Sequence, residues 1–140
     1  MGSKETKSLN EIKEAYPEKF ASEESIFSHI HRGDKIFVGT GCGEPQYLVR
    51  ALIDYVTSNP KAFFDAEVLQ VLTLGVAPYP EEKFKYNFRR NAFFVSDSTR
   101  DAISKGTADY TPIFLYQVPA LLERGFLPID VALIQTSLPD

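Results

Sequence analysis

Short, nearly continuous apolar runs alternate along the chain with segments in which apolar residues recur at helical spacing. Four of these runs predict β-strands, which span residues 35–39, 66–74, 92–95 and 129–137. A strand without polar alternation is typical of burial on both faces, as in a parallel sheet. We therefore expect parallel pairing, and the runs 66–74 and 129–137 are apolar enough for central positions.

Helical spacing and capping residues predict helices between these strands. The predicted helices cover residues 9–16, 22–30, 45–57, 97–106 and 118–124. Pro45 falls in the first turn of its helix, where the missing N–H is not needed. Strands that alternate with helices predict an open, mainly parallel α/β sheet with helices on both faces and right-handed crossovers.

The chain divides into two parts by its polarity. Residues 1–21 form a polar N-terminal segment with one predicted helix, and residues 22–140 form the α/β domain. Residues 107–112 are expected to form a turn between elements of this domain. Because the sequence stops just after a predicted parallel strand, we expect the domain to be truncated at its C-terminal end.

Composition narrows the choice of partners. The net charge is −4 and the pI is near 5.2. Proteins that bind nucleic acid or anionic membranes usually carry an excess of basic residues, so these two partners are disfavoured. One cysteine and two histidines give no recognisable metal-ligand spacing. No apolar run approaches the ~20 residues of a spanning helix, and no leader is apparent. We expect a cytoplasmic protein without a nucleic-acid, membrane or metal partner.

The glycine-rich turn after the first predicted strand holds most of the chemical information. Gly39, Gly41 and Gly43 allow positive φ and close approach of a ligand, and the helix that follows offers backbone N–H groups to an anion. The dinucleotide pattern G-x-G-x-x-G is only partly met, because its sixth position is Glu44. A tight turn without any ligand remains an alternative.

Three segments in this order resemble family I CoA-transferases, the group of acetyl-CoA hydrolases and 4-hydroxybutyrate CoA-transferases. The first joins GDKIFVG, from residue 33, to GEP and YLV. The second joins NAFFV, from residue 91, to RDA and GTADYTP, and the third is PIDVALIQTSLPD over residues 128–140. The similarity extends over residues 30–140, and the last segment is its most specific part.

The resemblance implies an incomplete, Rossmann-like α/β domain of the CoA-transferase type. Such enzymes move CoA from an acyl-CoA to a carboxylate, or release it to water, through a covalent glutamyl intermediate. In the family the nucleophilic glutamate and most of the CoA-binding surface lie in the C-terminal half. No residue of this chain then takes a catalytic role, and the isolated chain is expected to be inactive.

The resemblance also implies a site and partners. The turn would line one wall of the active site, at the carboxyl ends of the strands. Its backbone contributors around the acyl and pantetheine end would be Gly39, Gly41, Gly43, Glu44 and Pro45. A coenzyme A thioester would be the substrate, with no bound cofactor. The expected partners are an acyl-CoA, a carboxylate, the C-terminal CoA-transferase half and a second copy in a homo-oligomer.

Several side chains have both a functional and a structural interpretation. Glu44 is either a nucleophile or an acid favoured by the helix dipole, and the family favours the second. Cys42 is either a stabilised thiolate or a small packed thiol, and we favour the thiol. Residues 83–90 interleave bases and aromatics, which indicates a solvated face or an anion contact through Arg89 or Arg90.

Arg100 matches a family position and has two equal interpretations. It could hold a substrate carboxylate through a bidentate contact, or it could pin the neighbouring loop through Asp101 or Asp109. Two other classes of function are open for the whole chain. One is a self-associating or partner-docking module without catalysis, and the other is a phosphosugar- or nucleotide-binding domain.

Overall fold

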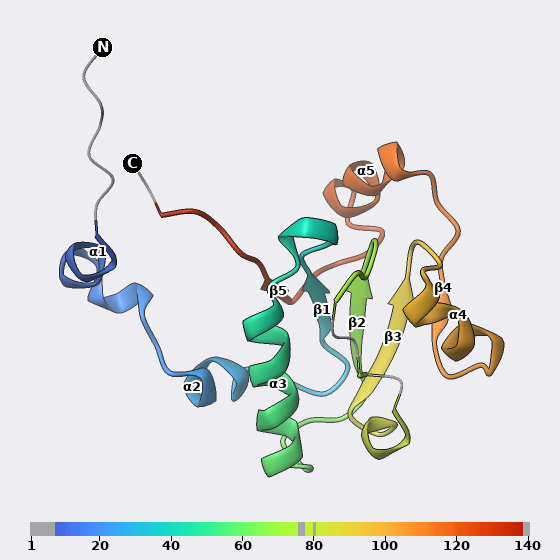
Figure 1. Cartoon of the computed structure of the whole chain (residues 1–140), viewed down its shortest axis with the longest axis horizontal. Coiled ribbons are helices and arrows are strands. Elements are labelled where there is room, and N and C mark those ends of the chain that lie inside the picture. The colour runs from blue at the N-terminus through green and yellow to red at the C-terminus, as the bar shows by residue number, and fades with distance from the viewer. Residues whose placement is uncertain (1–7, 76–77, 80, 139–140) are drawn as a thin grey trace.

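A five-stranded parallel sheet forms the centre of the molecule in a computed structural model that describes residues 8–75, 78–79 and 81–138 (Figure 1). Every strand pair is parallel, and the order across the sheet is β4-β3-β2-β1-β5. The strands are β1 (Lys35–Val38), β2 (Ala66–Gln70), β3 (Phe88–Ala92), β4 (Asp109–Tyr110) and β5 (Val131–Leu133). The predicted parallel α/β class is confirmed.

Helices connect and flank the strands. The α-helices are α1 (Leu9–Ala15), α2 (Glu23–Phe27), α3 (Gln46–Ser58), α4 (Asp97–Ser104) and α5 (Val118–Glu123). Short 3-10 helices are η1 (Pro17–Lys19), η2 (Gly41–Gly43), η3 (Glu82–Phe84) and η4 (Leu115–Gln117). Figure 1 shows α3 running beside β1, α4 next to β4, and α1 apart from the sheet.

The α3 helix forms because its apolar residues share one face. Val49, Leu52 and Val56 are buried, at the spacing expected of a helix that packs on a sheet. Pro45 is the N-cap residue of α3 rather than part of its first turn, a difference of one position. At α2, Ser22 is the N-cap, and its side chain accepts a hydrogen bond from the Ser25 N–H.

The core lies between α3 and one face of the sheet. Ile36, Val38, Ala66 and Val68 are fully buried there. Beside them is an aromatic cluster in which the Phe88 ring contacts three others at centroid distances of 5.4 to 6.1 Å. The other three rings are Phe63, Tyr79 and Phe84. Tyr79 and Phe84 precede β3 in the sequence, and Phe88 is the first residue of this strand.

Two predicted strands have different bounds in the structure. The strand expected at 92–95 is β3, which begins four residues earlier at Phe88. Phe88, Arg90 and Ala92 are buried while Arg89 is exposed, so two adjacent arginines concealed the period-2 pattern. The strand expected at 66–74 ends at Gln70, because the following backbone bonds to the glycine turn instead of continuing the ladder.

The last two strands also differ from expectation. β5 pairs only with β1 and stands at one edge, so its predicted central position is wrong for this chain. The predicted turn at 107–112 contains β4, a two-residue strand that pairs with the end of β3. A strand this short has too few residues to show any periodicity in the sequence.

We expect Phe88→Ala to lower the free energy of unfolding by about 3–5 kcal/mol, because it removes the ring that joins the aromatic cluster. Tyr86→Ala is the matched control, since Tyr86 belongs to the same segment but is 67% exposed. Urea denaturation followed by circular dichroism measures both. Equal losses in the two variants would show that the cluster does not stabilise the fold.

Candidate functional site

The glycine turn lies at the carboxyl end of β1 and leads through η2 into α3. Gly39 is in close contact with the far side of the turn: a Cβ atom there would be 2.8 Å from the Gly43 carbonyl oxygen. Gly41 has a φ of +59°, which disfavours other residues. Gly43 has open space around the position of a Cβ, so only two of the three glycines are required by the local geometry.

Backbone and hydroxyl groups join this turn to the segment after β2. The Thr40 hydroxyl donates to the Leu72 carbonyl at 2.6 Å and accepts from the Leu72 N–H at 2.5 Å. The Gly41 N–H donates to the same carbonyl at 3.0 Å. The chain after β2 is therefore held against the turn, which explains why β2 ends at Gln70.

Glu44 is buried in this turn, with 5% of its surface exposed. Its Oε2 atom accepts the N–H groups of Leu74 and Gly75, at 3.2 and 3.0 Å. Its Oε1 atom is also buried and has no hydrogen-bond partner among the described residues. The carboxylate is thus turned into the protein and holds a loop. This structural role is more specific than the stabilisation by the helix dipole that the sequence suggested.

A buried polar network runs from β3, past the end of β2, to the first glycine of the turn. Arg90 of β3 donates from Nη2 to the Thr73 hydroxyl, which donates to Gln70 Oε1 at 2.5 Å. Gln70 Nε2 reaches the Gly39 carbonyl at 3.4 Å. These three side chains are 1–3% exposed, so the network links β3 to the first glycine of the turn through the interior.

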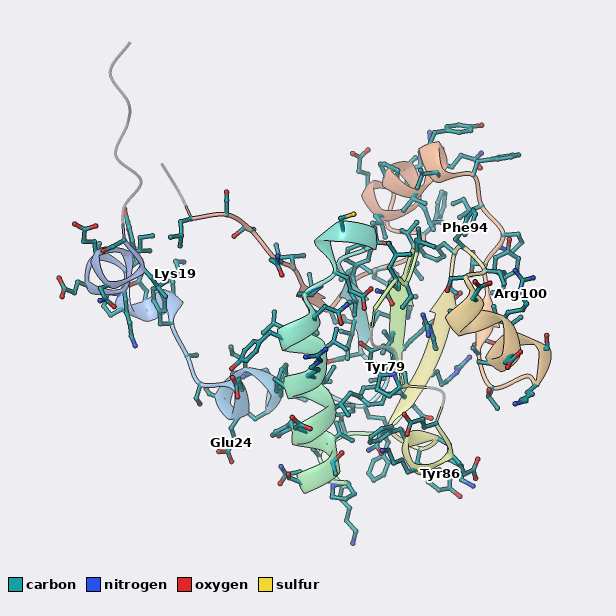
Figure 2. All side chains as sticks on the ribbon, in the orientation of Figure 1. Lys19, Glu24, Tyr79, Tyr86, Phe94 and Arg100 are labelled. Carbon is teal, nitrogen blue, oxygen red and sulfur yellow. The ribbon has the colours of Figure 1, made fainter. Side chains whose placement is uncertain are left out.

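Burial and neighbouring charges shift the pKa values of Arg90 and Tyr79 in this interior region. Burial lowers the pKa of Arg90, while the nearby Tyr79 and Glu44 favour its charged form. Burial raises the pKa of Tyr79, and Arg90 partly offsets that rise. Glu44 is a carboxylate that acts on both groups: it favours the charged form of Arg90 and adds to the rise of the Tyr79 pKa. Figure 2 shows Tyr79 in front of the middle of the sheet.

The other candidate residues do not join this site. Arg100 is on α4 with its guanidinium 3.9 Å from Asp97, so pinning through Asp101 or Asp109 is not observed. Asp109 pairs instead with Arg89 at 3.0 Å. Figure 2 shows Arg100 beside α4, at the other end of the strand order from α3 and the glycine turn. Cys42 is exposed on η2, so the expectation of a packed thiol is wrong.

The segment 83–90 is only partly a solvated face. Arg89 and Tyr86 are exposed, whereas Phe84, Phe88 and Arg90 belong to the interior. Sequence reasoning named Arg90 as an anion contact and missed its role beneath the turn. The alternation of Phe88, Arg90 and Ala92 is the signal that could have indicated it. Nothing in the sequence marks Gln70, Thr73 and Tyr79.

Neither a metal centre nor a membrane span is evident in the part of the chain that the structure describes. No three histidine, cysteine, aspartate or glutamate side chains there are grouped as metal ligands would be. No helix among these residues has the length and hydrophobicity to cross a bilayer.

Two solved structures share the fold of this chain. The crystal structure of RipA from Yersinia pestis matches with a TM-score of 0.72 and 25% identity, over 88% of this chain and 30% of that one. A 4-hydroxybutyrate CoA-transferase from Porphyromonas gingivalis matches with a TM-score of 0.63 and 19% identity, over 91% and 27%. The second likeness shows the fold alone.

Sequence comparison identifies the family. Residues 3–140 match the acetyl-CoA hydrolase/transferase N-terminal domain, and the chain belongs to that family. The 4-hydroxybutyrate coenzyme A transferase of Clostridium kluyveri is 40% identical over 93% of this chain. A succinyl-CoA:acetate/propanoyl-CoA:succinate CoA transferase of Fasciola hepatica is 34% identical over 89% of it. The chain spans 29% and 25% of the lengths of these two relatives.

We expect Gly39→Ala to lower the free energy of unfolding by about 1–3 kcal/mol, because its Cβ would displace the Gly43 carbonyl. Gly43→Ala is the matched control, and its change should stay within about 1 kcal/mol. Thermal or urea denaturation compares the two. If both alanines had the same effect, the close approach at Gly39 would not be a constraint on the turn.

We expect Glu44→Gln to lower the free energy of unfolding by about 1–3 kcal/mol, because it removes the negative charge near Arg90 and one buried acceptor. Glu18→Gln changes an exposed glutamate and should stay within about 0.5 kcal/mol of the unmodified chain. Urea denaturation at neutral pH measures both. A neutral effect of Glu44→Gln would refute the role of this carboxylate in the interior.

Proposed function

We propose that this chain is the N-terminal part of an acyl-CoA:carboxylate CoA-transferase or an acyl-CoA hydrolase. The observation that carries the proposal is the family match over residues 3–140, together with relatives that are CoA transferases. In this proposal the nucleophilic glutamate belongs to a C-terminal half, and the glycine turn forms one wall of the site between the two halves.

The chemistry that we propose is covalent and proceeds in steps. A glutamate carboxylate attacks the thioester carbonyl, and CoA leaves as a thiolate with the formation of an acyl-glutamyl anhydride. The thiolate then attacks the glutamyl carbonyl, which forms a glutamyl-CoA thioester and releases the first acid. The acceptor carboxylate repeats both steps in reverse and leaves as the new acyl-CoA. Water in place of the acceptor gives hydrolysis.

The geometry of Glu44 supports a nucleophile outside this chain. Its side chain is buried, and one of its two oxygens already accepts two backbone N–H groups. A thioester carbonyl cannot reach that oxygen without opening the loop at Leu74 and Gly75. We therefore propose that Glu44 positions the turn, and that Gly39, Gly41, Gly43 and Pro45 contribute backbone to the wall.

An exposed apolar surface supports a docking partner for this domain. Five large side chains lie beyond the carboxyl ends of the strands with exposures of 62–77%. Two of their rings stack at 5.9 Å. We call this the apolar end surface, and it consists of Phe94, Phe114, Leu115, Tyr116 and Phe126. Exposed apolar groups gathered in this way mark an interaction site.

A C-terminal CoA-transferase half is the partner that we propose for the apolar end surface, and a second copy of the chain is the alternative. Self-association of the 140 residues would favour the alternative, a binding module without catalysis. Sedimentation velocity over a range of concentrations distinguishes them. A monomer at every concentration counts against self-association through this surface.

Exchange of isotope tests the function. We would incubate acetyl-CoA with labelled acetate and either this chain alone or the same chain extended by its natural C-terminal continuation. We expect label to enter acetyl-CoA only with the extended chain, because the nucleophile is supplied there. Mass spectrometry of acetyl-CoA gives the rate, and the release of free CoA reports hydrolysis.

Two outcomes would contradict the proposal. Exchange by the 140 residues alone, abolished by Glu44→Gln, would place the nucleophile in this chain. The absence of both exchange and hydrolysis in the extended chain, with acetyl-, propanoyl-, butanoyl- and 4-hydroxybutanoyl-CoA, would refute a CoA-transferase or hydrolase.

A further inference from the structure

A small apolar cavity lies beside the glycine turn and shares three of its lining residues with the apolar end surface. Its volume is about 270 Å³, below the range of roughly 300–1,000 Å³ that is usual for drug-sized ligands. Three strands lead into its walls, since its residues follow β2, β3 and β4. All of its lining side chains are hydrocarbon: Val71, Leu72, Phe93, Phe94, Ile113, Phe114, Leu115 and Val118.

The cavity is connected to the turn through one residue. The backbone of Leu72 bonds to both Thr40 and Gly41, and Leu72 is also part of the cavity wall. Ligands of open parallel sheets bind at the carboxyl ends of the strands, where both features lie. A molecule held against the turn would therefore have the cavity next to it.

The side chains of the inner wall are buried, whereas those at the mouth of the cavity are exposed to solvent. Phe93 and Val118 are 2% and 7% exposed, so they are held in place by their surroundings. Phe94 and Phe114 at the mouth are 62% and 71% exposed and belong to the apolar end surface. Figure 2 shows Phe94 at the end of the sheet close to α5, the helix that begins with Val118.

We propose that this cavity binds the hydrocarbon chain of a short, uncharged acyl group, and so selects apolar acyl substrates over hydroxylated or dicarboxylic ones. The proposal rests on the proposed function, because that function supplies an acyl group at the turn. The same chain could arrive as an acyl-CoA or as a free carboxylate. In both cases its carbonyl or carboxylate end stays outside the hydrocarbon lining of the cavity.

The selectivity follows from the absence of polar side chains in the lining of the cavity. A terminal methyl group loses contact with water and gains apolar contacts on entry. A hydroxyl group in the same place would find no side-chain donor or acceptor in the lining, and an unpaired buried hydroxyl weakens binding by about fivefold or more. A second carboxylate would be disfavoured more strongly, because a charge would lose its hydration without a counter-charge.

Direct binding to the 140-residue chain tests the cavity without any need for turnover. Saturation-transfer NMR titrations would compare acetate, propanoate, butanoate, 4-hydroxybutanoate and succinate. We expect affinity to rise about fourfold for each added methylene from acetate to butanoate, as for a buried hydrocarbon chain. We expect 4-hydroxybutanoate to bind at least about fivefold more weakly than butanoate, and succinate more weakly still.

Two substitutions at Val118 locate the binding. Val118→Phe fills the cavity and should abolish the advantage of butanoate over acetate. Val118→Thr keeps the shape but adds a hydroxyl, and should narrow the difference between butanoate and 4-hydroxybutanoate. Ile26→Phe enlarges an apolar residue on α2, away from the cavity, and should leave the series unchanged. Circular dichroism confirms that each variant is folded.

Several results would overturn this proposal. They are equal affinity for butanoate and 4-hydroxybutanoate, no measurable binding of any acid, and a Val118→Phe variant that keeps the chain-length series. Acyl-CoA titrations identify the source of the chain: tighter binding of butanoyl-CoA than of butanoate assigns it to the thioester. Loss of CoA exchange in the extended chain, with the acid series intact, would refute the proposed function and leave the cavity assignment standing.

Discussion

A guanidinium group buried beneath the glycine turn is the constraint on which the candidate site depends. Arg90 is 1% exposed, and a buried charge without compensation costs several kcal/mol. Glu44 supplies the opposite charge from the turn, and Thr73 accepts from one nitrogen. The folded arrangement of β1, β2 and β3 brings this guanidinium group and the Glu44 carboxylate into the same interior, although no direct ion pair joins them in the described part of the chain.

Around this buried group, hydrogen bonds join the glycine turn after β1 to the loop after β2. Glu44 holds Leu74 and Gly75, Thr40 holds Leu72, and Gln70 reaches Gly39. Each contact joins the end of β1 to the chain that leaves β2. A surface loop is normally the part of a domain that is free to move. Here the backbone of the turn is held by several part-buried hydrogen bonds.

The sequence was sufficient for the layered α/β fold but not for the interior of the site. Apolar runs and capping residues located β1, β2 and α3, because burial on a parallel sheet leaves a direct pattern in the chain. Arg90 was missed as an interior residue because a charged side chain is expected outside, and only its partners make burial tolerable. Thr73 and Glu44, the groups that interact with it, lie 17 and 46 positions away in the sequence. At such separations no local sequence pattern links them to Arg90.

The turn also shows why glycine spacing alone does not identify a ligand. Gly39 and Gly41 meet the geometric needs of a dinucleotide turn, yet the position of the third glycine is occupied by a carboxylate. In a phosphate-binding turn that position is small, so that strand and helix can approach closely. Here Glu44 is buried and accepts two backbone N–H groups of the neighbouring loop. The strand–turn–helix frame therefore differs from a phosphate-binding turn: the glycines shape the turn, and the acid that breaks the motif holds the neighbouring loop against it.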